Sequence, residues 1–130
     1  MVAASEGRGH ERKLPRERRL TRGMEIRAIL ARGKRSRTVH LDVYDSASPV
    51  AHSRVGLVVP RHGHRVVGRN RLKRRLREIL RQEVLPRLDA PGAGWDVLVR
   101  ARRDAYDATY TELRTELLRW FEHRWPRGPY

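Results

Sequence analysis

Residues 65–81 hold the side chains with the clearest chemical capacity in this chain, which is the binding of phosphate. The stretch contains one acid, Glu78, and eight cations: Arg65, Arg69, Arg71, Lys73, Arg74, Arg75, Arg77 and Arg81. Several of the cations are four residues apart, so on a helix they would share a face and repel one another. A polyanion against that face would neutralise several charges at once and release counterions. The spacing therefore predicts a nucleic-acid-binding helix, with a solvated helix face as the alternative.

Side chains that could perform catalysis are few and scattered. The chain has no cysteine, no glycine-rich phosphate loop and no His-Glu-x-x-His motif. His62 and His64 flank a glycine, but no acidic residue follows closely enough to complete a metal site, so an exposed loop is favoured. Asp104 and Asp107 could hold a hydrated Mg²⁺ or serve as cap and turn residues. We expect no catalytic residue and no dedicated metal site in the protein.

The apolar pattern predicts the elements that position these groups. Helical spacing covers about residues 21–32, a basic helix that ends near 84–86, and a helix after Thr109, whose Thr-x-x-Glu sequence has the form of a capping box. Strand patterns cover residues 39–44, 54–59 and 95–101, and residues 34–37 could add an edge strand. The order α-β-β-α-β-α predicts an α+β fold, with a small mixed sheet packed by helices.

The domain organisation expected from these patterns is simple. Residues 1–16 read as a disordered basic tail, residues 17–124 as a single RNA-binding domain, and residues 125–130 as a frayed C-terminus. The tail could be a nucleic-acid-binding arm or a solubilising extension.

Composition narrows the class of partner. The 130 residues include 30 Lys and Arg against 15 Asp and Glu, which gives a net charge of +15. Such a balance favours RNA or DNA as the partner over an acidic membrane surface. Nearly all the cations are arginines, which suits phosphate recognition but could equally reflect a GC-rich genome. The lack of cysteines and of long apolar runs predicts a cytoplasmic protein.

Residues 69–78 read Arg-Asn-Arg-x-Lys-Arg-x-x-Arg-Glu. This run resembles the signature of the protein subunit of bacterial ribonuclease P. The resemblance extends over roughly residues 16–122, through shorter matches at residues 19–20, 33–35, 41–44, 54–57, 96–102 and 110–113 in the family's order.

This resemblance implies a two-layer sandwich with a left-handed crossover around the basic helix. It also implies a division of labour, in which the catalytic subunit is an RNA. Mg²⁺ ions held by that RNA and its substrate would activate the water that removes the 5′ leader of precursor tRNA. The protein would then be the accessory subunit of an endoribonuclease, with the catalytic RNA and precursor tRNA as its partners.

Carried over position by position, the resemblance implies that the catalytic RNA contacts Arg65, Arg69, Asn70, Arg71, Lys73, Arg74 and Arg77. A cleft between the first helix and one face of the sheet would hold the single-stranded leader, with a lining of Arg22, Ile26, Leu30, Leu41, Tyr44 and Arg61. Tyr44 could stack on an unpaired base or be an ordinary half-buried strand tyrosine. Three of these positions carry aliphatic residues where the family often has Phe, which predicts weaker stacking.

Two other functions stay open at this point. The first is a ribosomal or chaperone-like RNA-binding protein without a role in cleavage. The second, an autonomous protein nuclease, is less favoured because two-metal cleavage needs several convergent carboxylates, and the sequence shows no such group.

Overall fold

The structure is a computed structural model that describes residues 14–130. Its helices are α2 (Gly23–Arg32), α3 (Val66–Ile79), α4 (Leu85–Leu88) and α5 (Tyr110–Arg124), and its strands are β1 (Lys34–Arg37), β2 (Leu41–Ala47), β3 (Arg54–Val58) and β4 (Trp95–Ala101). Three short turns complete it: the 3₁₀ turns η1 (Arg16–Arg18) and η3 (Arg103–Asp107), and the π-helical turn η2 (Leu80–Val84). The predicted N-terminal tail lies outside the described residues, except for its last three positions.

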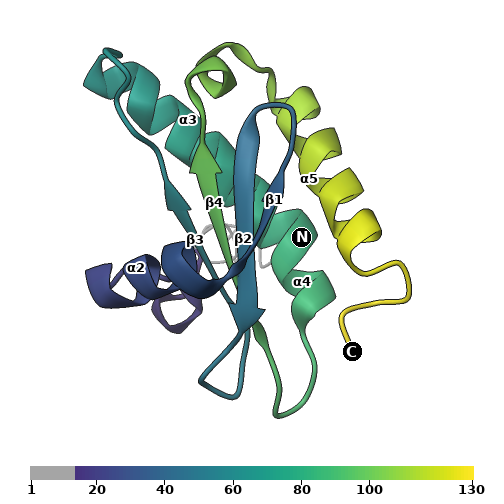
Figure 1. Ribbon diagram of the computed structural model, residues 1–130. Helices are drawn as coiled ribbons and strands as arrows, with labels where there is room; N and C mark the ends of the chain where they lie inside the picture. Colours follow the sequence, from purple (N-terminus) through teal and green to yellow (C-terminus); the bar gives the residue numbers. More distant parts are fainter. Residues whose placement is uncertain (1–13) are drawn as a thin grey trace, which may run out of the picture.

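The four strands form one mixed sheet in the order β1-β2-β4-β3. Strand β2 pairs antiparallel with both β1 and β4, whereas β3 and β4 are parallel. The chain passes from β3 to β4 through α3, which lies behind the sheet when both strands point upward and β4 is to the right of β3 (Figure 1). This connection is left-handed, against the strong right-handed preference of such crossovers. The α+β sandwich expected from the sequence is confirmed, including the edge strand β1.

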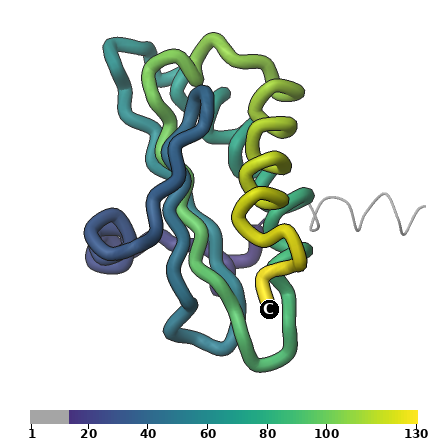
Figure 2. The backbone as a smooth tube through the Cα atoms, turned by 45° about the vertical axis from the view of Figure 1, so that its right-hand side comes forward, coloured from purple at the N-terminus to yellow at the C-terminus, as the bar shows by residue number. Residues whose placement is uncertain are grey.

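Helices cover the two faces of the sheet unequally. One face packs against α3, α4 and α5 around the main core, which includes Leu41, Val43, Leu76 and Leu117. The other face carries only α2, on a second, smaller core of Leu20, Ile29, Tyr44 and Leu98. Figure 2 shows α2 alone on its side of the sheet, with the C-terminal helix on the opposite side. Much of the α2 face is therefore open.

Local sequence explains how the long helices begin and end. At the start of α5, Thr109 Oγ1 accepts from the Glu112 amide at 3.1 Å, and the Thr109 amide donates to Glu112 Oε1 at 2.9 Å, which confirms the capping box. The basic helix was expected to end near Pro86, but helical structure continues to Leu88. The π turn η2 interrupts the α-helical ladder ahead of Pro86, and a proline is tolerated in the first turn of the helix that follows.

The structure differs from the sequence expectations at several strand and terminal positions. Strand β2 begins at Leu41 rather than residue 39, and Val39 is an exposed turn residue. Leu14, which was assigned to the tail, is buried in the main core. The segment expected to fray packs against the body: Trp125 is buried, and the Tyr130 hydroxyl donates to the Leu88 carbonyl at 2.7 Å.

None of the helices within residues 14–130 has both the length and the apolar composition that a bilayer span requires.

Candidate nucleic-acid interface

Helix α3 divides into a buried face and a cationic face. Leu72, Leu76 and Ile79 are buried in the main core, as their spacing predicted. The polar residues between them stay at least partly exposed to solvent. We call the α3 ridge the set formed by Arg65, Asn70, Arg71, Lys73, Arg74 and Arg77.

Like charges stand close together along the α3 ridge. The pKa of Lys73 is lowered from its usual value, first by partial burial and then by the charges of Arg69 and Arg77 one turn away on either side. A group of cations whose charged form is disfavoured gains when an anion approaches, because the anion restores the favourable environment for the charge. The ridge therefore favours a polyanionic partner.

Two of the cations in the stretch are used to hold the helix in place. Arg69 Nε donates to the Val59 carbonyl at 2.8 Å, which ties the start of α3 to the end of β3. Arg75 Nη1 donates to the Ala108 carbonyl at 3.1 Å, which ties the middle of α3 to the segment before α5. Arg69 was expected to contact RNA. Its Nε is bonded to the backbone, but the bond leaves the two terminal nitrogens of the guanidinium for a phosphate, so this contact stays a prediction.

A compact turn leads from β3 into α3. His62 and Gly63 have φ angles of 49° and 83°, so the turn uses the left-handed region twice in succession. The His64 ring stacks on Tyr106 with 3.8 Å between ring centroids, and the Tyr106 hydroxyl donates to the Pro60 carbonyl at 2.6 Å. This packing fixes the entry to the helix and leaves the Arg61 side chain exposed beside it.

The residues expected to line the leader cleft do not all lie on one surface. Ile26 and Leu30 of α2 are partly buried against the second core, and Arg22, just before α2, is exposed. Tyr44 belongs to the same core and is only 6% exposed, so its ring has little free surface in this structure.

Leu41 was wrongly assigned to this cleft. Its side chain is in the main core, on the face of the sheet that α3 and α5 cover. Residues three apart on a strand point to opposite faces, so Leu41 and Tyr44 were incompatible as members of one cleft.

The α2 face carries cations that the sequence reasoning did not select. In the register of the sheet, Arg37 of β1 lies opposite Asp42 of β2, and Asp42 lies opposite Arg100 of β4. Arg100 in turn lies opposite Val58 of β3. Laterally paired residues share a face, so this row lies on the same side as Tyr44, in the half that α2 leaves open (Figure 1). Arg37 and Arg100 are exposed. Strand alternation counted from Tyr44 would have identified them.

The described part of the chain offers no ready metal site. Within residues 14–130, no three His, Asp or Glu side chains converge as a ligand group. Asp104 and Asp107 are both exposed at the ends of η3 and form no such group.

Comparison with known proteins decides the family. The sequence pattern of the family named Ribonuclease P matches residues 14–124. The chain belongs to the ribonuclease P protein family. A ribonuclease P protein component from Syntrophobacter fumaroxidans is 36% identical over 117 residues, which cover 90% of this chain and 95% of that relative. Another, from Acidothermus cellulolyticus, is 37% identical over 105 residues, or 79% of this chain and 84% of that relative.

Solved ribonuclease P proteins share the fold. The protein from Thermotoga maritima superimposes with a TM-score of 0.68 at 26% identity, covering 81% of this chain and 96% of that one. The Staphylococcus aureus protein gives a TM-score of 0.68 at 22% identity, covering 82% of this chain and 94% of that one. At this level of identity the likeness supports a shared fold only. The sequence resemblance to the ribonuclease P family is thus confirmed.

Proposed function

We propose that this chain is the protein component of a ribonuclease P and promotes removal of the 5′ leader from precursor tRNA. It works as the accessory subunit of an endoribonuclease in an RNA-containing ribonucleoprotein. The observation that carries the assignment is the α3 ridge. It is a row of positively charged side chains on a helix whose opposite face is buried, in a chain that belongs to this family.

The α3 ridge is the surface we assign to the catalytic RNA. Its exposed arginines present planar forks suited to phosphate, and its backbone is held rigidly by the Arg69 and Arg75 contacts with neighbouring elements. A rigid array loses little conformational entropy on binding, so more of the electrostatic gain appears as affinity.

The open half of the α2 face is the surface we assign to the single-stranded leader. Val58 and Leu30 provide partly exposed apolar surface there, while Arg37 and Arg100 provide charge for the backbone phosphates. Arg22 and Arg61 are exposed at the ends of neighbouring elements and could extend the path. With Tyr44 buried, recognition of the leader depends more on charge and aliphatic contact than on stacking.

We assign the Mg²⁺ ions of the reaction to the RNA partner and the substrate. This fits the dispersed carboxylates of residues 14–130, and Mg²⁺ commonly binds through phosphates with few protein ligands. We place the ribonucleoprotein in the cytoplasm, where an assembly acting on precursor tRNA would meet its substrate.

Reconstitution at low Mg²⁺ tests the function. The purified chain is added to a cognate catalytic RNA, and cleavage of precursor tRNA is measured at an Mg²⁺ concentration where the RNA alone is slow. We expect the chain to increase the cleavage rate and a matched Arg71→Ala, Arg74→Ala variant to increase it less. An RNA-binding protein without a role in cleavage would bind but leave the rate unchanged, and cleavage by the protein alone would contradict the accessory role.

A further inference from the structure

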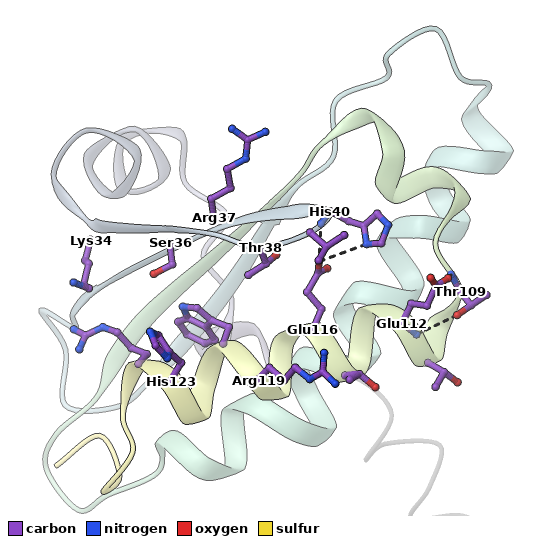
Figure 3. A pocket seen from close by; sticks show the side chains of 15 residues that line it. Lys34, Ser36, Arg37, Thr38, His40, Thr109, Glu112, Glu116, Arg119 and His123 are labelled. Atoms are coloured by element: carbon purple, nitrogen blue, oxygen red, sulfur yellow. Dashed lines mark hydrogen bonds and ion pairs between the residues drawn. The ribbon is translucent and has the colours of Figure 1, made fainter.

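A cleft of about 860 Å³ lies between strand β1 and helix α5. Two rows of side chains line it. From β1 come Lys34 and Ser36, with Thr38 just beyond the strand, and from α5 come Glu116 and His123 (Figure 3). Arg37 points the other way, toward the α2 face, as strand alternation requires. The cleft therefore lies on the opposite face of β1 from the proposed leader surface, and Arg37 borders both.

Polar atoms deep in this cleft lack partners. Glu116 is 8% exposed, and its Oε1 accepts from the His40 amide at 2.6 Å and lies 3.4 Å from the His40 ring Nδ1, whereas its Oε2 has no hydrogen bond to any described residue. Trp120, one turn further along α5, is 5% exposed, and its indole Nε1 is also without a partner within residues 14–130. Unpaired buried polar atoms are costly, so a free acceptor and a free donor on residues one turn apart in α5 indicate a ligand that supplies their partners.

The other end of the cleft is cationic. Lys34 and His123 face each other across it, and Lys34 lies opposite Asp45 of β2, whose carboxylate is bound by Arg124. Arg124 also lines this end, but its guanidinium is bound to Asp45 at 3.0 Å. His123 is seven residues beyond Glu116, which corresponds to about 10 Å along the helix axis. An extended nucleotide places its phosphate and the edge of its base at a comparable separation.

We propose that this cleft binds one unpaired nucleotide. Its phosphate lies at Lys34 and His123, its ribose beside Ser36, and the edge of its base at Glu116 and Trp120. The edge of a base carries both donors and acceptors, so it can satisfy both orphan atoms: an N–H donates to Glu116 Oε2, and a ring nitrogen or carbonyl oxygen accepts from the indole N–H. Unpaired bases are read in this way, by hydrogen bonds to their edges. The nucleotide is either one residue of an RNA strand or a free nucleotide.

The indole N–H resonance of Trp120 reports occupancy directly. The ¹⁵N-labelled full-length chain is titrated with each of the four nucleoside 5′-monophosphates, with inorganic phosphate and with the unphosphorylated nucleosides, up to concentrations on the order of millimolar. We expect at least one monophosphate to shift the Trp120 resonance and to saturate, with phosphate or nucleoside alone binding more weakly. The Trp95 indole, which already donates to the Pro129 carbonyl, serves as an internal reference.

Two variants separate the roles of the cleft. Lys34→Ala should weaken binding of the monophosphate roughly tenfold and leave that of the nucleoside unchanged. Glu116→Gln keeps an oxygen for the His40 amide but exchanges the free acceptor for a donor, so it should change which base is preferred. Arg127→Ala removes an equal charge from an exposed site away from the cleft and should have no effect.

The outcome is independent of ribonuclease P activity because no catalytic RNA is present. Tighter binding of a short oligonucleotide than of the monophosphate would identify an RNA strand as the source, and equal binding would identify a free nucleotide. The proposal would be overturned if no probe moved the Trp120 resonance. It would also be overturned if the Lys34→Ala and Glu116→Gln variants bound the nucleotides with the affinity and base preference of the unmodified chain. Either result would leave the function of the α3 ridge intact.

Discussion

Arg54 of β3 and Asp96 of β4 form a buried two-point ion pair, with Nε and Nη2 of the arginine donating to the carboxylate at 3.0 and 2.7 Å. The arginine also reaches Glu25 of α2 at 2.7 Å. These bonds raise the pKa of Arg54 above its usual value, with the Asp96 hydrogen bond as the largest cause. A single guanidinium thus links the two parallel strands to the helix on the open face.

Removal of Asp96 should be strongly destabilising. Asp96→Ala leaves the buried Arg54 charge with Glu25 alone, and breaking a buried pair typically costs about 3–5 kcal/mol. Urea unfolding followed by circular dichroism measures the free energy of unfolding. Asp89→Ala is the matched control: it breaks the 2.8 Å pair with Arg18 at a more exposed site and should cost about 1 kcal/mol or less. Equal losses would show that burial does not govern the Arg54–Asp96 pair.

Loss of two exposed cations from the α3 ridge should flatten the salt dependence of RNA binding. Each phosphate contact removed reduces the steepness of the plot of log affinity against log salt by ~0.7–0.9. Arg71→Ala with Arg74→Ala should therefore reduce the steepness by up to about twice that amount. Filter binding or fluorescence anisotropy over a salt series gives the slope. Arg87→Ala with Arg127→Ala removes the same charge elsewhere and should leave the slope nearly unchanged. A slope preserved in the ridge variant would exclude the ridge as the interface.

The lowered pKa of Lys73 should respond to its neighbours. Arg77→Ala should raise the pKa of Lys73 toward 10.5 by removing one repulsive charge, and bound RNA should raise it as well. The folded chain releases this proton at lower pH than the unfolded chain does. The charged lysine therefore destabilises the folded state fully below its folded-state pKa, and this destabilisation disappears as the pH rises toward the unfolded-state pKa. Side-chain ¹⁵N NMR of the lysines measures the shift, with Arg127→Ala as control. An unchanged value in Arg77→Ala would rule out the charge contribution.

The open α2 face should discriminate precursor from mature tRNA. Arg37→Ala with Arg100→Ala removes two exposed charges from the proposed leader path, so affinity for a precursor with a leader should fall while affinity for mature tRNA stays the same. Binding of both RNAs to the reconstituted ribonucleoprotein provides the comparison. Equal losses for the two RNAs would place these arginines outside the leader path.

Tyr44 should behave first as a core residue. Tyr44→Ala empties a buried site in the second core and should cost about 3–5 kcal/mol, as truncation of a buried aromatic usually does. Tyr44→Phe keeps the packing and should cost far less. Thermal unfolding of both variants tests this expectation, and a near-neutral Tyr44→Ala would show instead that the ring is available for another role.

Local patterns were enough to predict the ridge and most elements. The buried and exposed faces of α3 follow from the spacing of Leu72, Leu76 and the cations between them, because helical periodicity depends only on the local chain. The capping box of α5 was legible for the same reason. Leu41 was misplaced because the resemblance to the family was followed where strand alternation pointed elsewhere.

Other features depend on contacts between distant segments and could not be read locally. Nothing near Arg69 in the sequence indicates that its side chain would bond to the Val59 carbonyl. The cleft that contains Glu116 forms only where β1 meets α5, some 80 residues later in the chain. Trp125, likewise, is buried by an aromatic cluster with Trp95, Trp120 and Phe121 that tertiary packing brings together.

The small second core has a consequence for hydrogen exchange. Helix α2 is held by a core of four buried residues, one of which is its own Ile29, and by the Glu25–Arg54 contact, whereas α3 and α5 share the main core. Segments with few buried apolar contacts open at lower free energy than the whole molecule. Amides of α2 should therefore exchange faster than those of α3 and α5, by opening events that leave the rest of the fold intact. Each such event uncovers the Tyr44 ring, which makes the helix a reversible cover for the one aromatic residue on that face of β2.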